Sequence, residues 1–252
     1  IVQPNTFNMY CHREPRFYLT VVWNGQWFKW ENRNTNFLYG QPDGGPTHDA
    51  PQNGYLNRSR VSLDYIPRDN NHPYRPAIIF RMAEAYLSYA EALNESSERM
   101  SHKQEILDNL NKIRHRAGIA EYGTGTDENG FTRIKINFSD QKEVRRLIHK
   151  ERRVEFVGEG VRYHDLRRWK TAHYGIGNLN EQGENPDWGV NGPDYGMNYY
   201  GTEYTDQGDN AFFKRTKYMD RVYPRKFYWY PIHQSEIDKD PTLVQGPFWL
   251  GE

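Results

Sequence analysis

The chain has 252 residues, with 33 lysines and arginines against 33 aspartates and glutamates, so its formal net charge is zero. A chain without a basic excess has no general electrostatic attraction for nucleic acid or for an anionic membrane surface. No apolar run approaches the roughly 20 residues that a membrane-spanning helix needs. A single cysteine, Cys11, excludes a disulfide framework within the chain.

The mean hydropathy of −1.01 suggests a very polar chain, but the content of aromatic residues indicates a folded one. Phenylalanine, tyrosine and tryptophan make up 15% of the chain, whereas disordered chains are poor in these residues. We therefore predict a folded chain whose core is built from rings rather than from leucine and isoleucine. Aromatic rings also suit the recognition of sugars or peptides, because each offers a flat apolar face with few rotamers to restrict.

Residues 1–77 are predicted to form a loop-rich segment that contains a β-hairpin. Two runs of strand-forming residues flank Asn24-Gly25, a dipeptide typical of type I′ turns. A two-residue turn at this position would place Val22 opposite Trp27. After the hairpin, the many asparagines, glycines and prolines of residues 32–57 indicate irregular loops.

The register of this hairpin assigns each side chain to a face, because side chains alternate along a strand. The apolar face is predicted to face the core and comprises Leu19, Val21, Trp23, Phe28 and Trp30. The opposite face mixes aromatic and polar residues, so Trp27 is predicted to be exposed. The candidate ligand-binding residues are Trp27, Tyr18, Trp23 and Trp30. Trp27 leads this set, since a buried sheet face explains Trp23 and Trp30 equally well.

Residues 78–170 are predicted to be a helical region. The apolar row Ile78, Met82, Ala85, Tyr86, Tyr89 and Leu93 indicates a first helix, and Ile106, Leu107, Leu110, Ile113 and Ala117 indicate a second. The short connection between them predicts an antiparallel helix pair. A third helix is predicted to start near Ser139-Asp140, and a fourth after Gly160.

Residues 171–252 are predicted to form an irregular, aromatic-rich loop region followed by a C-terminal packing segment. The whole chain is interpreted as one domain. It lacks an initiator methionine, a signal peptide and a lipid-attachment pattern before Cys11. We therefore interpret it as a piece of a longer protein.

Residues 151–170 place charges on faces that otherwise look buried. Glu151 and Glu155 share a stripe with Ile148, and Asp165 shares a row with Val161. A buried carboxylate must find a donor or it destabilises the fold by several kcal/mol. We predict a structural ion network that comprises Glu151, Arg153, Glu155, Arg162 and Asp165. The alternative is a pair of catalytic carboxylates of a glycoside hydrolase, which would lie about 5–9 Å apart in a solvent-accessible cleft.

Other catalytic and metal-binding patterns are missing from the sequence. The nine histidines have no metal-binding spacing, and no phosphate-binding loop, GxSxG or dinucleotide-binding motif occurs. We therefore predict no metal, no cofactor and no catalytic residue.

Five segments resemble, in this order, the C-terminal half of the SusD/RagB family: EPRFYLTVVWNG (14–25), RMAEAYLSYAEALNE (81–95), LNKIRHRAGI (110–119), ERRVEFVGEGVRYHDLRRWK (151–170) and YPIHQSEIDKDPTLVQGPFW (230–249). The chain departs from the family pattern at four places. Glu14 replaces an aspartate, His233 a second proline and Asp240 an asparagine, while residues 246–249 read Gly-Pro-Phe-Trp instead of Asn-Pro-Gly-Trp.

This resemblance implies a mainly α fold: a helical bundle with tetratricopeptide-like helix pairs, a small β-hairpin and long irregular aromatic-rich loops. Members of the family are not enzymes. They are lipid-anchored at the cell-surface face of the outer membrane, capture oligosaccharides, or peptides in some members, and deliver them to a TonB-dependent transporter. The anchor lies in an N-terminal region that is absent from this chain. We therefore predict a glycan-capture protein, with a glycoside hydrolase and a peptide-capture protein as alternatives.

Overall fold

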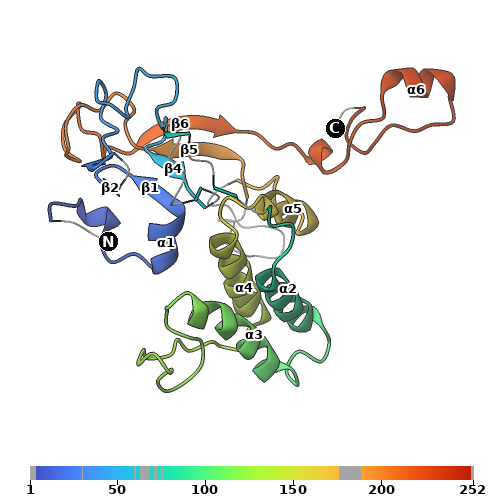
Figure 1. Cartoon of the computed structure of the whole chain (residues 1–252). Coiled ribbons are helices and arrows are strands. Elements are labelled where there is room, and N and C mark those ends of the chain that lie inside the picture. Colours follow the sequence, from blue (N-terminus) through green and yellow to red (C-terminus); the bar gives the residue numbers. More distant parts are fainter. Residues whose placement is uncertain are drawn as a thin grey trace. The chain divides into compact units, whose positions relative to one another are not determined.

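The computed structural model describes residues 4–29, 31–59, 61–62, 69–70, 73–74, 77–175 and 189–250. The chain divides into two compact units: unit 1 comprises residues 1–160 and 197–214, and unit 2 comprises residues 161–196 and 215–252. Figure 1 labels the α-helices and most of the strands. In the described part of the chain, strands pair only two at a time and no sheet closes. The fold is mainly α, as predicted.

The segment after Pro15 is a helix and not the first strand of a hairpin. Helix α1 (Pro15–Thr20) begins with a proline, a residue that suits the first helical position because its missing N–H is not needed there. The Thr20 hydroxyl donates a hydrogen bond of 2.7 Å to the carbonyl oxygen of Arg16. Strand β1 (Val21–Trp23) starts only after this helix. The prediction of a strand over residues 16–20 was wrong because the helix-start signal of Pro15 outweighs the strand propensity of Phe17 and Tyr18.

Asn24 and Gly25 form a turn, but the strands that flank this turn do not pair with each other. The amide of Gln26 donates to the carbonyl of Trp23 at 3.2 Å. Of the two central residues only Gly25 has a positive φ, +89°, whereas a type I′ turn needs a positive φ at both. The chain therefore does not fold back at this point, and the predicted pairing of Val22 with Trp27 was wrong.

Each flanking strand pairs with a later segment instead. Strand β1 is antiparallel to β4 (Tyr55–Asn57), and β2 (Trp27–Phe28) is antiparallel to β3 (Arg33–Asn34). The small hairpin of this unit is thus β2–β3. As a result the predicted core face is also wrong in part, since Leu19 and Phe28 are exposed.

The core beneath these strands is built largely from rings, as the composition predicts. Its buried members are Tyr10, Trp23, Phe37, Leu38, Phe212 and Phe213. Tyr10 lies in the short 3-10 helix η1 (Asn8–Tyr10), and the two last phenylalanines enter from residues 197–214. The indole of Trp23 lies 5.4 Å from the ring of Phe17 and 5.9 Å from that of Tyr10, centroid to centroid.

The other part of unit 1 is helical. It contains α2 (Met82–Glu95), α3 (Lys103–Arg116) and α4 (Gln141–Glu155), and α2 packs against both of the others. Helix α2 begins four residues later than predicted and buries a different row, which includes Ala83, Leu87 and Ala90. Met82 and Tyr89 are exposed. The small alanine side chains let the neighbouring helices approach this face closely, which explains the rotation relative to the predicted row.

Helices α3 and α4 follow their predicted signals. The apolar row of α3 is buried, and Gly118 follows its end with a φ of +66°. The Asp140 carboxylate caps α4 by accepting hydrogen bonds from the amides of Lys142 and Glu143. After α4, Gly158 adopts a φ of +78° so close to Asn57 that a Cβ atom would lie 2.0 Å from its side-chain nitrogen. A side chain at this position would be strained by the positive φ and would displace the side chains of Asn57 and Ser59.

Unit 2 contains α5 (Val161–Arg168), the antiparallel pair β5 (Gly192–Gly196) and β6 (Thr216–Arg221), the 3-10 helix η3 (Arg225–Tyr228) and α6 (Gln234–Lys239). Strand β5 lies in a region that the sequence predicted to be irregular. The signal was weak because its residues, GPDYG, include two glycines and a proline, which are depleted in strands.

Candidate functional site

The β2–β3 hairpin carries an exposed indole on one of its two faces. Trp27 lies directly opposite Asn34, and Phe28 lies opposite Arg33. Directly opposite residues project from the same face, with Cβ atoms about 4.5–5.5 Å apart. Trp27 and Asn34 therefore share one face, and Phe28 and Arg33 share the other. Trp27 is 43% exposed and Phe28 is 41% exposed.

Asn34 lines an uncharged cleft of about 410 Å³. The polar side chains that line this cleft are Asn5, Thr6, Asn24, Asn34, Thr35, Asn36 and Tyr204. None of its lining residues is ionised at neutral pH, and four of them are asparagines. We call this feature the asparagine cleft. A carboxamide both donates and accepts hydrogen bonds, so the cleft can satisfy a ligand that presents both donors and acceptors.

Asn24 is the most deeply placed amide of the cleft. It is 1% exposed, and its Oδ1 accepts a hydrogen bond of 2.7 Å from the amide of Phe37. Its Nδ2 has no acceptor among the described residues. A buried donor without a partner lowers stability by about 1–3 kcal/mol. Asn24 Nδ2 is therefore an unsatisfied donor buried behind the wall of the asparagine cleft.

The other face of the hairpin borders a smaller apolar cleft of about 240 Å³, whose lining includes Phe28, Val22, Phe37 and Leu56. The two exposed aromatic residues of β2 thus project into different surroundings. Trp27 stands beside amides, and Phe28 stands beside apolar side chains.

Asp43 positions the loop that supplies Asn34 and Asn36. Its carboxylate accepts two hydrogen bonds from the Arg33 guanidinium, at 2.6 and 2.8 Å, and one of 2.8 Å from the amide of Asn36. Burial raises the pKa of Asp43, but the hydrogen bonds from Arg33 and Asn36 outweigh burial and hold this pKa below its ordinary value. The carboxylate therefore stays ionised and keeps the loop in one conformation.

The four predicted ligand-binding residues do not come together. Trp23 is 1% exposed and belongs to the core, so it offers no face to a ligand. The Tyr18 hydroxyl donates to the carbonyl of Tyr10 at 2.8 Å and accepts from the amide of Arg13 at 3.0 Å, which indicates a structural role. Trp30 lies outside the described residues. Of the predicted set, Trp27 is exposed and lies opposite a lining residue of the asparagine cleft, Asn34, although Trp27 does not line the cleft itself.

Sequence reasoning missed Asn34, Asn36 and Tyr204. The two asparagines lie in a stretch that was interpreted only as loop, and Tyr204 is 179 residues away from Gly25. A Cβ atom on Gly25 would lie 3.1 Å from the Tyr204 hydroxyl. Local sequence patterns carry no signal for such a long-range approach.

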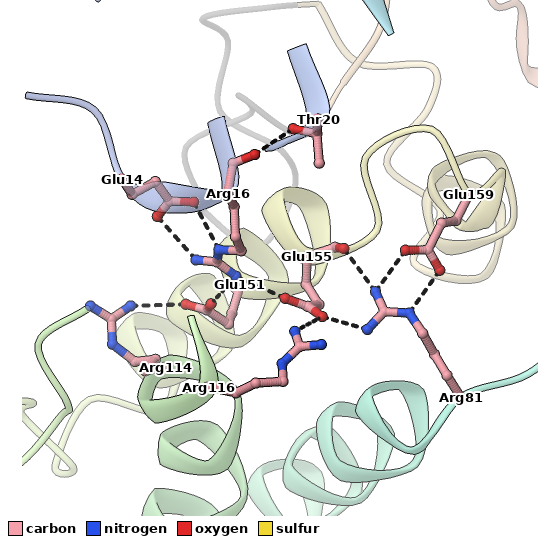
Figure 2. A network of polar contacts seen from close by, with 9 residues as sticks. All are labelled: Glu14, Arg16, Thr20, Arg81, Arg114, Arg116, Glu151, Glu155 and Glu159. Atoms are coloured by element: carbon pink, nitrogen blue, oxygen red, sulfur yellow. Dashed lines mark hydrogen bonds and ion pairs between the residues drawn. The ribbon is translucent and has the colours of Figure 1, made fainter. Parts of the chain in front are cut away.

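The second polar cluster of unit 1 is the ion network shown in Figure 2. Glu151 and Glu155 lie one turn apart on α4 and are 3% and 7% exposed. Glu151 accepts hydrogen bonds from Arg16 at 2.7 Å and from Arg114 at 2.9 Å. Glu155 accepts from Arg16 at 3.1 Å and also from Arg81 and Arg116.

The network extends beyond these two carboxylates. Arg81 also donates to both carboxylate oxygens of Glu159, at 2.7 and 2.9 Å (Figure 2). Arg16 makes a two-pronged contact with Glu14 at 2.8 and 3.0 Å. Glu14 therefore orients the arginine that reaches α4.

Glu151 and Glu155 are buried and paired with arginines, and the arginines seen to pair with them lie outside the predicted set. Arg153 is exposed, and Arg162 belongs to unit 2. The actual arginines are Arg16, Arg81, Arg114 and Arg116, which come from α1, the N-cap of α2 and the end of α3. Asp165 is 3% exposed and pairs with Arg168 at 2.9 Å, which confirms its predicted burial and its pairing with a nearby arginine.

The comparisons with known proteins agree with this architecture. A family model described as the SusD family matches residues 3–249. The chain belongs to the SusD family. Its match to a SusD-like protein of Formosa agariphila, P25, is 32% identical over 109 residues, which are 43% of this chain and 18% of that protein. A second protein of the same organism, SusD-like protein P38, is 32% identical over 103 residues, 41% of this chain and 19% of that protein.

Solved structures show the same fold. A SusD-like protein of Bacteroides fragilis is 26% identical, with a TM-score of 0.66 over 98% of this chain and 41% of that protein. A SusD-like carbohydrate-binding protein of the same species is 23% identical, with a TM-score of 0.59 over 96% of this chain and 43% of that protein. The chain thus spans about two fifths of the length of these structural relatives. None of the helices in the described residues combines the length and apolar composition needed to cross a bilayer.

Glu155→Ala is expected to destabilise the fold by about 3–5 kcal/mol, because it leaves the largely buried guanidinium of Arg16 and that of Arg81 without their shared carboxylate. Urea unfolding followed by circular dichroism measures this change. The control is Glu236→Ala, which removes an exposed glutamate paired with Lys239 and is expected to change stability by less than about 1 kcal/mol. Equal stability of the two variants would contradict a structural role for the network.

Stability is expected to fall on acidification through the pKa of Glu155. Burial raises this pKa, but Arg81, Arg116 and Arg16 outweigh burial and hold it below the ordinary value of 4.5. The unfolded chain therefore binds this proton more readily than the folded chain does. The contribution is fully present above about pH 4.5 and is lost as the pH falls below it. Unfolding measured from pH 7 to pH 3 should show a shallower acid loss for Glu155→Gln than for the wild type.

Proposed function

We propose that unit 1 captures a neutral oligosaccharide in the asparagine cleft, with the indole of Trp27 stacked on a sugar ring. The observation that supports this proposal is the pairing of the exposed Trp27 with Asn34, because Asn34 lines a cleft that is rich in amides and free of charge. Membership of the SusD family supports glycan capture in general.

The chemistry of the cleft suits a sugar better than a charged ligand. Each sugar hydroxyl both donates and accepts hydrogen bonds, as a carboxamide does, and the C–H face of a pyranose is apolar and flat enough to pack on an indole. A peptide brings charged side chains or charged ends, for which the cleft has no ionic partner. An acidic sugar would likewise find no cationic side chain among the residues that line this cleft.

The alternative of a glycoside hydrolase has less support. Such enzymes need two carboxyl groups that face a substrate. Glu151 and Glu155 are buried and accept hydrogen bonds from four arginines. A carboxylate held in this way is neither free to donate a proton nor open to water, so the network favours structure over catalysis.

The same proposal covers the setting in which the protein works. We infer that it acts at the cell-surface face of the outer membrane, anchored by a lipid on an N-terminal region, and passes its oligosaccharide to a TonB-dependent transporter. The support is the family to which the chain belongs, together with the name of the carbohydrate-binding protein of Bacteroides fragilis that shares its fold.

Trp27→Ala is expected to weaken the binding of a neutral oligosaccharide about fivefold, because stacking on one ring contributes on the order of 1 kcal/mol. Calorimetric titration after a screen of neutral glycans measures the effect. The matched control is Phe28→Ala, which removes an equally exposed ring from the opposite face of the same strand and should leave the affinity unchanged. Equal losses in the two variants, or no loss in Trp27→Ala, would place the sugar elsewhere.

Incubation with the bound oligosaccharide is expected to release no new reducing ends. The reason is that the candidate carboxylates of the hydrolase alternative are buried and paired with arginines, Glu151 and Glu155 on α4 as well as Asp165 on α5. If turnover is detected and disappears in Glu151→Gln, the protein is a hydrolase and the interpretation of the ion network as purely structural is wrong.

A further inference from the structure

The zero net charge of the chain conceals a strongly basic stretch in unit 2. Residues 161–175 and 215–230 contain nine lysines and arginines but only two acidic residues, Asp165 and Asp220. The cations are Arg162, Arg167, Arg168, Lys170, Arg215, Lys217, Arg221, Arg225 and Lys226. Such an excess in one part of a neutral protein creates a local positive potential.

The two segments form one surface, which we call the basic surface. Arg167 Nη2 donates a hydrogen bond of 2.7 Å to the carbonyl of Tyr228. The backbone amide of His173 donates to the Tyr228 hydroxyl at 3.2 Å. Residues of α5, including Tyr163, also face residues 219–223 across a cleft of about 480 Å³.

Four cations of the basic surface, Arg167, Lys170, Arg215 and Lys226, lie over aromatic rings instead of beside carboxylates. The Arg167 guanidinium lies 5.3 and 5.0 Å from the ring centroids of Tyr163 and Tyr230. The Lys170 ammonium lies 5.2 and 4.6 Å from those of Tyr228 and Trp229, and that of Lys226 lies 5.0 Å from Trp249. In the described part of unit 2, the carboxylates that form ion pairs do so with other cations: Arg168, Lys217, Arg221 and Lys239.

A ring restrains a cation without neutralising it. The attraction between the ring face and the charge limits the rotamers of a long side chain, so less conformational entropy is lost when an anion binds. Arg167 is held further by the hydroxyls of Tyr163 and Tyr230, which accept its hydrogen bonds at 2.8 and 3.3 Å. Arg167, Lys170 and Lys226 are therefore positive charges of the basic surface that rings hold in position without neutralising them.

We propose that the basic surface binds an acidic oligosaccharide, one that carries carboxylate or sulfate groups, at a site separate from the asparagine cleft. The ligand's anionic groups would contact the ammonium groups of Lys170 and Lys226 and the guanidinium of Arg167. Charge complementarity and the restrained cations carry this inference, which does not depend on the neutral-glycan site.

The arrangement favours an acidic sugar over single-stranded nucleic acid. Nucleic-acid platforms offer free ring faces on which bases stack. Here cations already cover faces of Tyr163, Tyr228, Trp229, Tyr230 and Trp249. What the surface presents to a ligand is mainly charge.

The test is a titration of the protein, at low and at physiological ionic strength, with a dextran sulfate oligosaccharide, an oligogalacturonate, a neutral dextran and an oligothymidylate. The first two probes separate sulfate from carboxylate recognition. We expect at least one of them to bind, with an affinity that falls as salt screens the charges, and the neutral dextran not to compete for this site.

The decisive variant is Lys170→Gln/Lys226→Gln, which is expected to weaken binding of the acidic probe about tenfold. Its matched control is Lys103→Gln/Lys112→Gln in unit 1, because these lysines also lie over rings, 5.3 Å from Phe138 and 4.5 Å from Tyr86. The control removes the same charge and should leave the affinity unchanged. Trp27→Ala should also leave it unchanged, so failure of the neutral-glycan site and failure of this one are distinguishable.

Three results would overturn the proposal. These are no binding of either acidic probe at low ionic strength, equal losses in the two double-lysine variants, or tighter binding of the oligothymidylate than of both acidic sugars. The last result would assign the surface to nucleic acid.

Discussion

The buried glutamates of α4 are the constraint on which the rest of unit 1 depends. A buried carboxylate without donors destabilises a fold by several kcal/mol, so Glu151 and Glu155 require their arginines to be in place. Those arginines come from α1, from the N-cap of α2 and from the last turn of α3. None of these elements can shift without exposing or stranding a charge. Because α1 runs directly into β1 and the Asn24-Gly25 turn, the same contacts fix the first part of the asparagine cleft.

The sequence predicts that the two glutamates are buried and need arginine partners, but it does not identify those partners. Glu151 and Glu155 fall on an apolar stripe, and that pattern alone predicted burial and arginine partners. It could not identify those partners, because Arg16 is 135 residues away from Glu151 and nothing in the local pattern links them. For Asp165, in contrast, the local sequence also indicated where the partner lies. Its partner Arg168 lies three residues further along the same helix, within the range in which helical periodicity is informative.

The strands around Asn24 and Gly25 show the same limit of local sequence patterns, which do not identify the segment that pairs with each strand. The dipeptide predicted a turn and a turn exists, yet pairing is decided by which segments are available on each side. Here β4 and β3 take the places that a hairpin partner would have occupied. Trp27 is exposed, as predicted, but its neighbours are those of β3. The pairing of β2 with β3 was needed to identify Asn34 and Asn36 as site residues, whereas the buried row of α3 followed from periodicity alone.

The net charge of this chain does not predict what it can bind, because its charged residues are distributed unevenly. In unit 1, arginines and glutamates neutralise each other in a buried network and leave the asparagine cleft without charge. In unit 2, ten lysines and arginines are balanced by ten acidic residues, but nine of these cations fall within residues 161–175 and 215–230, which hold only two of the acidic residues. A net charge of zero is thus compatible with a local excess of positive charge. Recognition depends on the charges within a few ångströms of the ligand, since salt screens exposed charges beyond about 8–10 Å, so each surface selects its ligand by its own local composition.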